Sequence, residues 1–110
     1  MKRVYLESPY AGDVARNLRY VRACMADCLR RGEAPYASHA LYTQDGVLRD
    51  EVPEERALGM NAGEAFRAAC DLTVVYTDLG TSRGMAWGIE NAARIGHPVE
   101  MRSLGEGWDA

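Results

Sequence analysis

Residues 73–89 read TVVYTDLGTSRGMAWGI and join a strand, a loop and the start of a helix. The run Thr73–Tyr76 is typical of a short buried strand. Glycines and hydroxyl side chains then form a loop that leads into a helix expected over residues 82–95. The first N–H groups of such a helix have no partner within it, so they point at whatever occupies the loop. The stretch therefore predicts an anion or ribose site at the carboxyl end of a strand.

The rest of the chain repeats the alternation of strand and helix. Further short strands are expected over residues 3–6, 34–38 and 97–101, and helices over residues 13–31 and 54–70. Asp13 is a natural N-cap for the first of these helices, and Pro53 suits the first position of the second. Helices of about 15 residues between short strands call for parallel pairing with right-handed crossovers. The sequence thus predicts an α/β, Rossmann-like (flavodoxin-like) three-layer fold with a small parallel sheet of about four or five strands.

Composition narrows the class of protein. A chain of 110 residues suits a single domain over residues 1–110, with a glycine-rich tail, 103–110, that we expect to be loose. The net charge of −3, without a basic patch, argues against binding of a nucleic-acid polymer. No apolar run approaches the roughly 18 residues of a membrane span, and no signal peptide is recognisable. We therefore expect a cytoplasmic protein that does not bind membranes.

The three cysteines have no spacing typical of metal ligands. Cys24 and Cys28 share one face of the first expected helix, and Cys70 stands alone. The pair is either a redox or metal pair or, as free cysteines commonly are, part of the hydrophobic core. The sequence gives no reason to expect a metal or a cofactor.

Loops at the carboxyl ends of the expected strands supply the candidate ligand-binding side chains. Because these ends meet at one edge of a parallel sheet, we expect the side chains to converge there. The candidates for substrate binding are Ser8, Tyr10, Gly12, His39, Asp78, Ser82, Gly84 and Met85. His39 either touches the substrate or is a hydrogen-bonded structural histidine. Asp78 either contacts the ligand or caps a turn.

Several segments together resemble the nucleoside 2-deoxyribosyltransferase superfamily. They are the opening RVYLESPYAGD (3–13), Ala69-Cys70-Asp71 before the Val-Val strand, and the turn Ser82-Arg83-Gly84-Met85. This superfamily includes nucleoside deoxyribosyltransferases and deoxynucleoside monophosphate N-glycosidases. The chain looks most similar to the uncharacterised small phage and bacterial members, in which APYASHALYTQ (34–44) and PEERALG (53–59) are also familiar.

The resemblance implies chemistry at the N-glycosidic bond of a nucleoside or nucleoside monophosphate. In the characterised members, a carboxylate on the helix after the turn attacks the anomeric carbon and holds the sugar as a glycosyl ester. That glutamate corresponds here to Gly88, and a second acid corresponds to Gly63, with Glu64 beside it. Glu90, Asp78 or Glu64 would then have to act as the nucleophile. Glu90 is nevertheless expected to point away, because it lies roughly 200° around a helix from position 88.

Three classes of function remain open. The first is an N-glycosidase or 2-deoxyribosyltransferase with Glu90 or Asp78 as catalytic residue. The second is a nucleotide-binding or sequestering protein of the same fold without catalysis, because glycine occupies position 88. The third is a structural subunit without a pocket. The resemblance also implies a homodimer or larger homo-oligomer, for which the small residues of the helix 54–70 suit a self-complementary interface.

Overall fold

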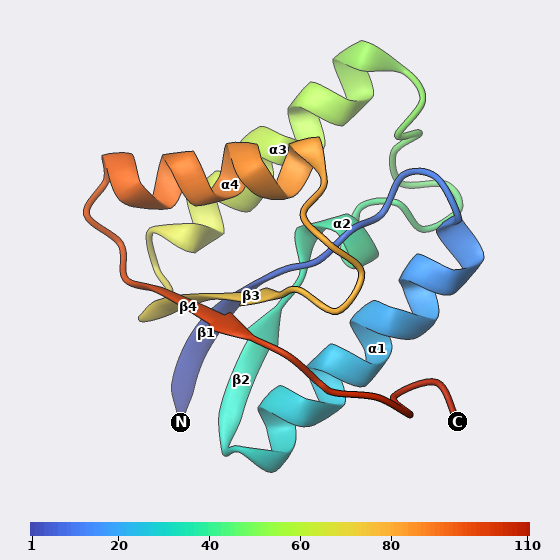
Figure 1. The fold of residues 1–110 in the computed structure, drawn as a ribbon. Helices are drawn as coiled ribbons and strands as arrows, with labels where there is room; N and C mark the ends of the chain where they lie inside the picture. Colours follow the sequence, from blue (N-terminus) through green and yellow to red (C-terminus); the bar gives the residue numbers. More distant parts are fainter.

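Four parallel strands form the centre of the fold in a computed structural model that describes residues 1–110. The strands are β1 (Lys2–Glu7), β2 (Glu33–Tyr36), β3 (Leu72–Tyr76) and β4 (Val99–Arg102). They lie in the order β2-β1-β3-β4, and every neighbouring pair is parallel (Figure 1). This is the order of a flavodoxin-like sheet, whose direction of winding reverses between β1 and β3. The Rossmann-like α/β fold predicted from the sequence is confirmed.

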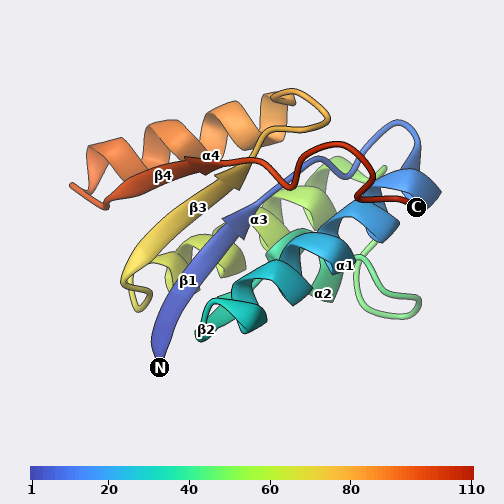
Figure 2. The same ribbon diagram turned by 60° about the horizontal axis from the view of Figure 1, so that its bottom comes forward.

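Four helices connect the strands: α1 (Val14–Arg30), α2 (Ser38–Leu41), α3 (Pro53–Arg67) and α4 (Arg83–Arg94). Helix α1 covers one face of the sheet, whereas α3 and α4 lie together on the other (Figures 1 and 2). The predicted helix starts are confirmed, since the Asp13 side chain accepts from Arg16 N and the Ser82 side chain from Met85 N. No helix has both the length and the apolar character that crossing a bilayer requires.

Two predicted strands are displaced along the chain. β2 ends at Tyr36 because Ser38 already begins α2. β4 begins at Val99 rather than at residue 97. His97 precedes the strand, and its ring nitrogens bind Thr73 Oγ1 at 2.9 Å and the Cys70 carbonyl at 2.8 Å. His97 therefore has a structural place, joining the start of β3 to that of β4.

The two faces of the sheet have different chemistry. The face under α1 is apolar and holds the main core, to which the strands and α1 contribute Val4, Leu6, Val74, Tyr76, Tyr20, Val21, Cys24 and Cys28. Cys24 and Cys28 are thus core residues, as free cysteines commonly are. The alternation of side chains along a strand sends Tyr5, Glu7 and Thr73 to the opposite face, under α3 and α4. Polar groups are therefore buried on that face beside the carboxyl end of β1.

The C-terminal residues 103–110 are held against the body of the protein. Trp108 packs edge-on against Tyr20, with ring centroids 4.9 Å apart, and Arg19 forms an ion pair with Asp109 at 3.2 Å. Asp78 accepts hydrogen bonds from the Ser103 hydroxyl and from the backbone N–H groups of residues 104 and 105. The tail is consequently docked instead of loose, because a carboxylate and an aromatic ring fix it at two places.

Candidate functional site

A cleft of about 340 Å³ lies at the carboxyl end of β1, bordered by α2, α3 and the start of α4. Its volume falls within the roughly 300–1,000 Å³ of small-molecule sites. Six of the eight residues proposed from the sequence line it: Ser8, Tyr10, His39, Ser82, Gly84 and Met85. Residues that follow three different strands, in loops and in the first turns of helices, are therefore brought together, as the parallel topology predicts.

Gly12 lies just outside this cleft. It is exposed in the loop between β1 and α1 with a φ of 100°, a backbone conformation that favours glycine. Its carbonyl accepts a hydrogen bond from Val14 N at 2.9 Å. Gly12 therefore shapes the loop that carries Tyr10 but does not line the cleft.

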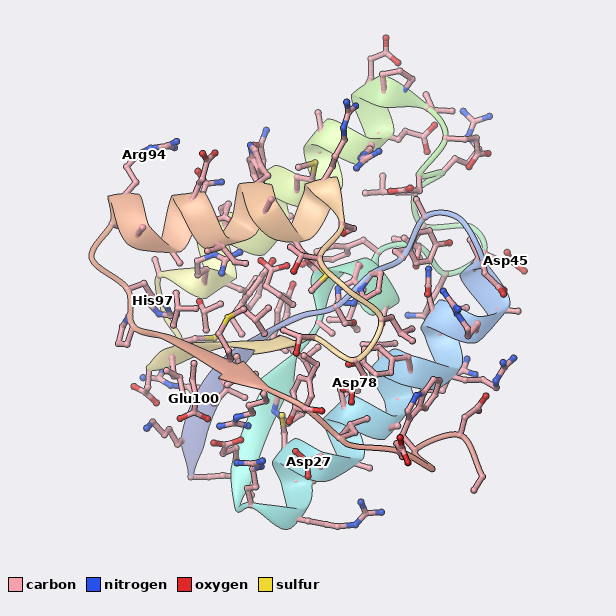
Figure 3. The ribbon with its side chains drawn as sticks, in the orientation of Figure 1. Asp27, Asp45, Asp78, Arg94, His97 and Glu100 are labelled. Carbon is pink, nitrogen blue, oxygen red and sulfur yellow. The ribbon has the colours of Figure 1, made fainter.

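Asp78 also lies outside the cleft, beside α1 (Figure 3). The Tyr20 hydroxyl donates to its carboxylate at 2.5 Å, in addition to the three donors of residues 103–105. Burial alone would raise the pKa of Asp78, but these hydrogen bonds lower it to about 2. An ionised carboxylate with four donors is a structural anchor, and it is not placed to contact a ligand in the cleft.

Glu90 occupies an exposed position on α4 and does not line the cleft either. The turn of the helix explains this placement, because the buried side of α4 is formed by Met85, Gly88, Asn91 and Ala92. Of the three carboxylates that the sequence suggested as nucleophile, Asp78 and Glu90 thus lie outside the cleft, whereas Glu64 lines it. The carboxylates that do line the cleft are Glu7, Glu64 and, on the loop before α3, Asp50.

Arg67, which also lines the cleft, joins two of these carboxylates. Its Nη2 donates to Glu7 Oε2 at 2.5 Å and to Glu64 Oε2 at 2.9 Å, and its Nε donates to Glu64 Oε1 at 2.9 Å. Nη1 donates to Thr73 Oγ1 at 2.9 Å, and the guanidinium lies 4.0 Å from the centre of the Tyr5 ring. The Arg67 side chain is only 1% exposed, so these partners compensate for burying its charge.

Glu7 fills a space that exists because residue 88 is glycine. A Cβ on residue 88 would overlap Glu7 Oε2 and would lie 2.6 Å from Glu7 Cδ and 2.8 Å from Arg67 Nη2. Gly88 itself is buried in α4. The carboxylate of Glu7 therefore lies directly against the backbone of α4, where a side chain of that helix would otherwise be.

Burial sets the protonation of two groups in the cleft. It raises the pKa of Glu7 to about 7; Arg67 opposes the rise and Glu64 adds to it. Burial lowers the pKa of His39 to about 4, so the imidazole is neutral at pH 7. His39 Nε2 and Ser8 Oγ are 2.7 Å apart and hydrogen-bonded. The cleft thus offers a neutral histidine and a carboxyl group that titrates near neutrality.

Sequence reasoning missed Glu7 and Arg67. Glu7 is the last residue of a strand whose other inward residues are apolar or aromatic, which is an unusual place for a carboxylate. That signal was readable, because a charged residue at the carboxyl end of a parallel strand commonly belongs to a site. Arg67 gave no signal, since its i,i+3 spacing from Glu64 is also that of an ordinary surface ion pair. No cluster of three or more His, Cys, Asp or Glu side chains is arranged to hold a metal ion.

The Rossmann-like α/β fold of this chain is also found in solved structures of 2-deoxyribosyltransferases. The structure is similar to that of a 2-deoxyribosyltransferase from the psychrotolerant bacterium Bacillus psychrosaccharolyticus, with a TM-score of 0.65, 17% identity, and coverage of 94% of this chain and 74% of the other. It is also similar to a 2-deoxyribosyltransferase from Leishmania mexicana, with a TM-score of 0.55, 18% identity, and coverage of 96% and 66%. At these identities the likeness shows the fold.

Family membership is shown by the sequence itself. The chain belongs to the family described as domain of unknown function DUF7768, whose model matches residues 2–102. None of the curated proteins matches the chain.

Proposed function

We propose that this protein acts at the N-glycosidic bond of a nucleoside or nucleoside monophosphate, as an N-glycosidase or a 2-deoxyribosyltransferase-like enzyme. The observation that carries the proposal is the pair of carboxylates, Glu7 and Glu64, held by one arginine in a cleft of small-molecule size. The cleft lies at the carboxyl end of β1, where the sheet changes its direction of winding and where open α/β sheets commonly bind ligands.

The spacing of this pair suits glycosyl transfer with retention. Cleavage of a glycosidic bond passes through a transition state with positive charge on the sugar, which nearby carboxylates stabilise. Retaining enzymes hold two carboxyl groups about 5 Å apart, and inverting enzymes hold them roughly 6.5–9.5 Å apart. Glu7 Oε2 and Glu64 Oε2 lie 2.5 Å and 2.9 Å from the same nitrogen of Arg67, so the two oxygens are closer together than the pair of an inverting enzyme.

The proposal extends to the assembly and location of the protein. Leu58 and Phe66 are large apolar side chains on α3 that are 60% and 50% exposed, which favours a homodimer or larger homo-oligomer through this helix. Light scattering after gel filtration would test this, and a monomer at micromolar concentration would count against it. A nucleotide substrate also favours a cytoplasmic location.

Base release is the direct test of the enzyme. The purified protein is incubated with the common ribonucleosides, deoxynucleosides and their 5′-monophosphates, with and without a free base as acceptor, and products are separated by chromatography. We expect a free base or an exchanged nucleoside from at least one substrate. Glu90→Gln is the matched control, because it removes a carboxylate of α4 that does not line the cleft. No product at high protein concentration would refute the enzymatic function.

A binding protein of the same fold is the second candidate. It is favoured by the ion pairs that Arg67 forms with both Glu7 and Glu64, because such pairing lowers the reactivity of a carboxylate. This candidate predicts a rise in melting temperature with a nucleoside or nucleotide and no turnover, since a ligand that binds only the folded state stabilises it. Turnover of the ligand that raises the melting temperature would refute it.

A further inference from the structure

The two oxygens of Glu7 have different environments. Oε2 accepts the hydrogen bond from Arg67 Nη2, whereas Oε1 takes part in no hydrogen bond. The only buried side-chain nitrogen or oxygen in the molecule without a hydrogen-bond partner is Asn17 Oδ1. Oε1 of Glu7 is therefore not sealed in the protein, and Glu7 lines the cleft. One oxygen is anchored and the other is free to meet a ligand.

The other two carboxylates of the cleft are placed differently. Both oxygens of Glu64 accept hydrogen bonds from Arg67, through Nε and Nη2. Asp50 belongs to the loop before α3 and has no place in the buried cluster around Arg67. Glu7 is thus the carboxylate that is fixed by a buried partner and still presents an unoccupied oxygen to the cleft.

We propose that Glu7 is the nucleophile of this site, presented to the sugar by strand β1 through the space at Gly88. This inference rests on the proposed function at the N-glycosidic bond. Glu7 Oε1 forms a bond to the anomeric carbon while the bond from that carbon to the base nitrogen breaks. The electron pair of the broken bond stays on the base, which takes a proton from solvent and leaves.

Water completes the reaction. Its oxygen bonds to the anomeric carbon, the ester bond to Glu7 breaks, and the electron pair of that bond returns to the carboxylate. The proton that water loses balances the one taken up by the base. Arg67 assists this second step because its guanidinium stabilises the carboxylate as it leaves the sugar. Arg67 is a positioning residue, since its contacts are with Glu7, Glu64 and Thr73.

Trapping the covalent intermediate tests the assignment. The probes are 2′-deoxy-2′-fluoro-arabinosyl nucleosides and their 5′-monophosphates, with the base that the wild-type protein releases fastest. Fluorine at the 2′ position destabilises the positively charged transition state, which slows both steps and allows a glycosyl ester to accumulate. We expect intact-mass analysis to show one added fluoro-sugar and peptide mapping to place it on Glu7.

Five variants separate Glu7 from its neighbours. Glu7→Gln keeps the shape of the side chain, and we expect it to form no adduct and to lower kcat by about 1,000-fold or more. Glu64→Gln and Asp50→Asn are expected to retain the adduct. The double variant Glu7→Ala/Gly88→Glu moves the carboxylate to α4, into space vacated by Glu7, and is expected to be at least about tenfold more active than Glu7→Ala. Circular dichroism checks that each variant is folded.

The outcomes distinguish this inference from the proposed function. Base release with the adduct on Glu64 or Asp50, or with more than about a tenth of the activity kept by folded Glu7→Gln, overturns the assignment of Glu7 and leaves the N-glycosidic function standing. Absence of base release by the wild-type protein overturns both. An adduct on Glu7 that is lost in Glu7→Gln supports the proposal.

Discussion

The substitution Gly88→Ala examines the close packing between α4 and Glu7. The added methyl group would overlap Glu7 Oε2 and lie 2.6 Å from Glu7 Cδ, so the carboxylate has to move. Gly84→Ala is the matched control on the same helix. Its methyl group would meet only Arg56 Nη2 at 3.8 Å and Ser82 Oγ at 4.0 Å, which are ordinary contact distances. Only the first substitution is therefore expected to disturb the buried ion pair.

The expected magnitude follows from what the displaced carboxylate leaves behind. Breaking a buried ion pair by removing one partner costs about 3–5 kcal/mol. Arg67 keeps Glu64 as a partner, so the lower end, about 3 kcal/mol, applies. Replacing glycine by alanine within a helix returns up to about 1 kcal/mol. We expect Gly88→Ala to lower the free energy of unfolding by about 2 kcal/mol and Gly84→Ala to leave it unchanged or slightly raised.

A double-mutant cycle measures the contact itself. Urea unfolding is followed for the wild type, Gly88→Ala, Glu7→Ala and the double variant, and the midpoints and slopes give the four free energies. Without the Glu7 carboxylate, the two nearest atoms are removed, and the next is Arg67 Nη2 at 2.8 Å, the end of a guanidinium that can shift by a few tenths of an ångström. We therefore expect a coupling free energy of about 2–3 kcal/mol between positions 7 and 88.

Equal unfolding free energies for Gly88→Ala and Gly84→Ala would refute the packing of Glu7 against α4. A coupling below about 0.5 kcal/mol would do the same, because that is the level expected of independent sites. Either result would also remove the geometric basis for assigning the nucleophile to Glu7.

Three further predictions concern protonation and the role of Asp78. Because Glu7 has a pKa of about 7 when folded and an ordinary value of 4.5, the folded protein binds this proton more tightly, and that stabilisation is lost as the pH rises through 7. From pH 5 to pH 8 the wild type should lose up to about 3 kcal/mol of unfolding free energy relative to Glu7→Gln, measured by urea unfolding at both pH values. The same change of unfolding free energy in both proteins would contradict the raised pKa of Glu7. His39, with its pKa lowered to about 4, should remain neutral at pH 5 in a proton NMR titration, and a midpoint near 6.5 would show that burial does not act on it. Asp78→Ala should lower the unfolding free energy by about 3 kcal/mol, because its hydrogen bonds to Tyr20 and to residues 103–105 are lost. The same variant should leave kcat/KM for base release unchanged well below the melting temperature. A loss of activity in the folded variant would show that Asp78 takes part in the site.

Local signals made the fold predictable. Some of these signals act within a few residues and can therefore be read directly from the sequence. They are the strand Thr73–Tyr76, the caps Asp13 and Ser82, and Pro53 at a helix start. The order of these elements then leaves few topologies. The loops that line the cleft follow from the same rule, because the carboxyl ends of parallel strands share one edge.

The cleft carboxylates were harder to predict because their placement depends on distant parts of the chain. Asp78 stands at a strand end, where a ligand contact is common, but Tyr20 and the C-terminal residues occupy its carboxylate. Glu7 gains its place only through Arg67 on α3 and Gly88 on α4. Neither the contact of Glu7 with Arg67 nor its contact with Gly88 can be predicted from a single sequence, since both depend on how tightly the helices pack on the sheet.

The two glycines that the family resemblance marks as missing acids have a common structural cause. Tyr5 and Glu7 alternate onto the same face of β1, and each fills the space beside one of these glycines. A Cβ on Gly63 would overlap the Tyr5 hydroxyl and lie 2.9 Å from Ser38 Oγ, just as a Cβ on Gly88 would overlap Glu7. At both positions the helix carries no side chain and a larger side chain of the strand fills the space, an exchange of size between helix and strand. Tyr5 and Glu7 reach the cleft from β1, whose backbone is fixed by β2 and β3 on both sides. If this exchange is physical, members of the family with a side chain at position 88 should carry a residue smaller than glutamate at position 7. Members with glutamate at 7 and a large residue at 88 would show that the two positions are independent.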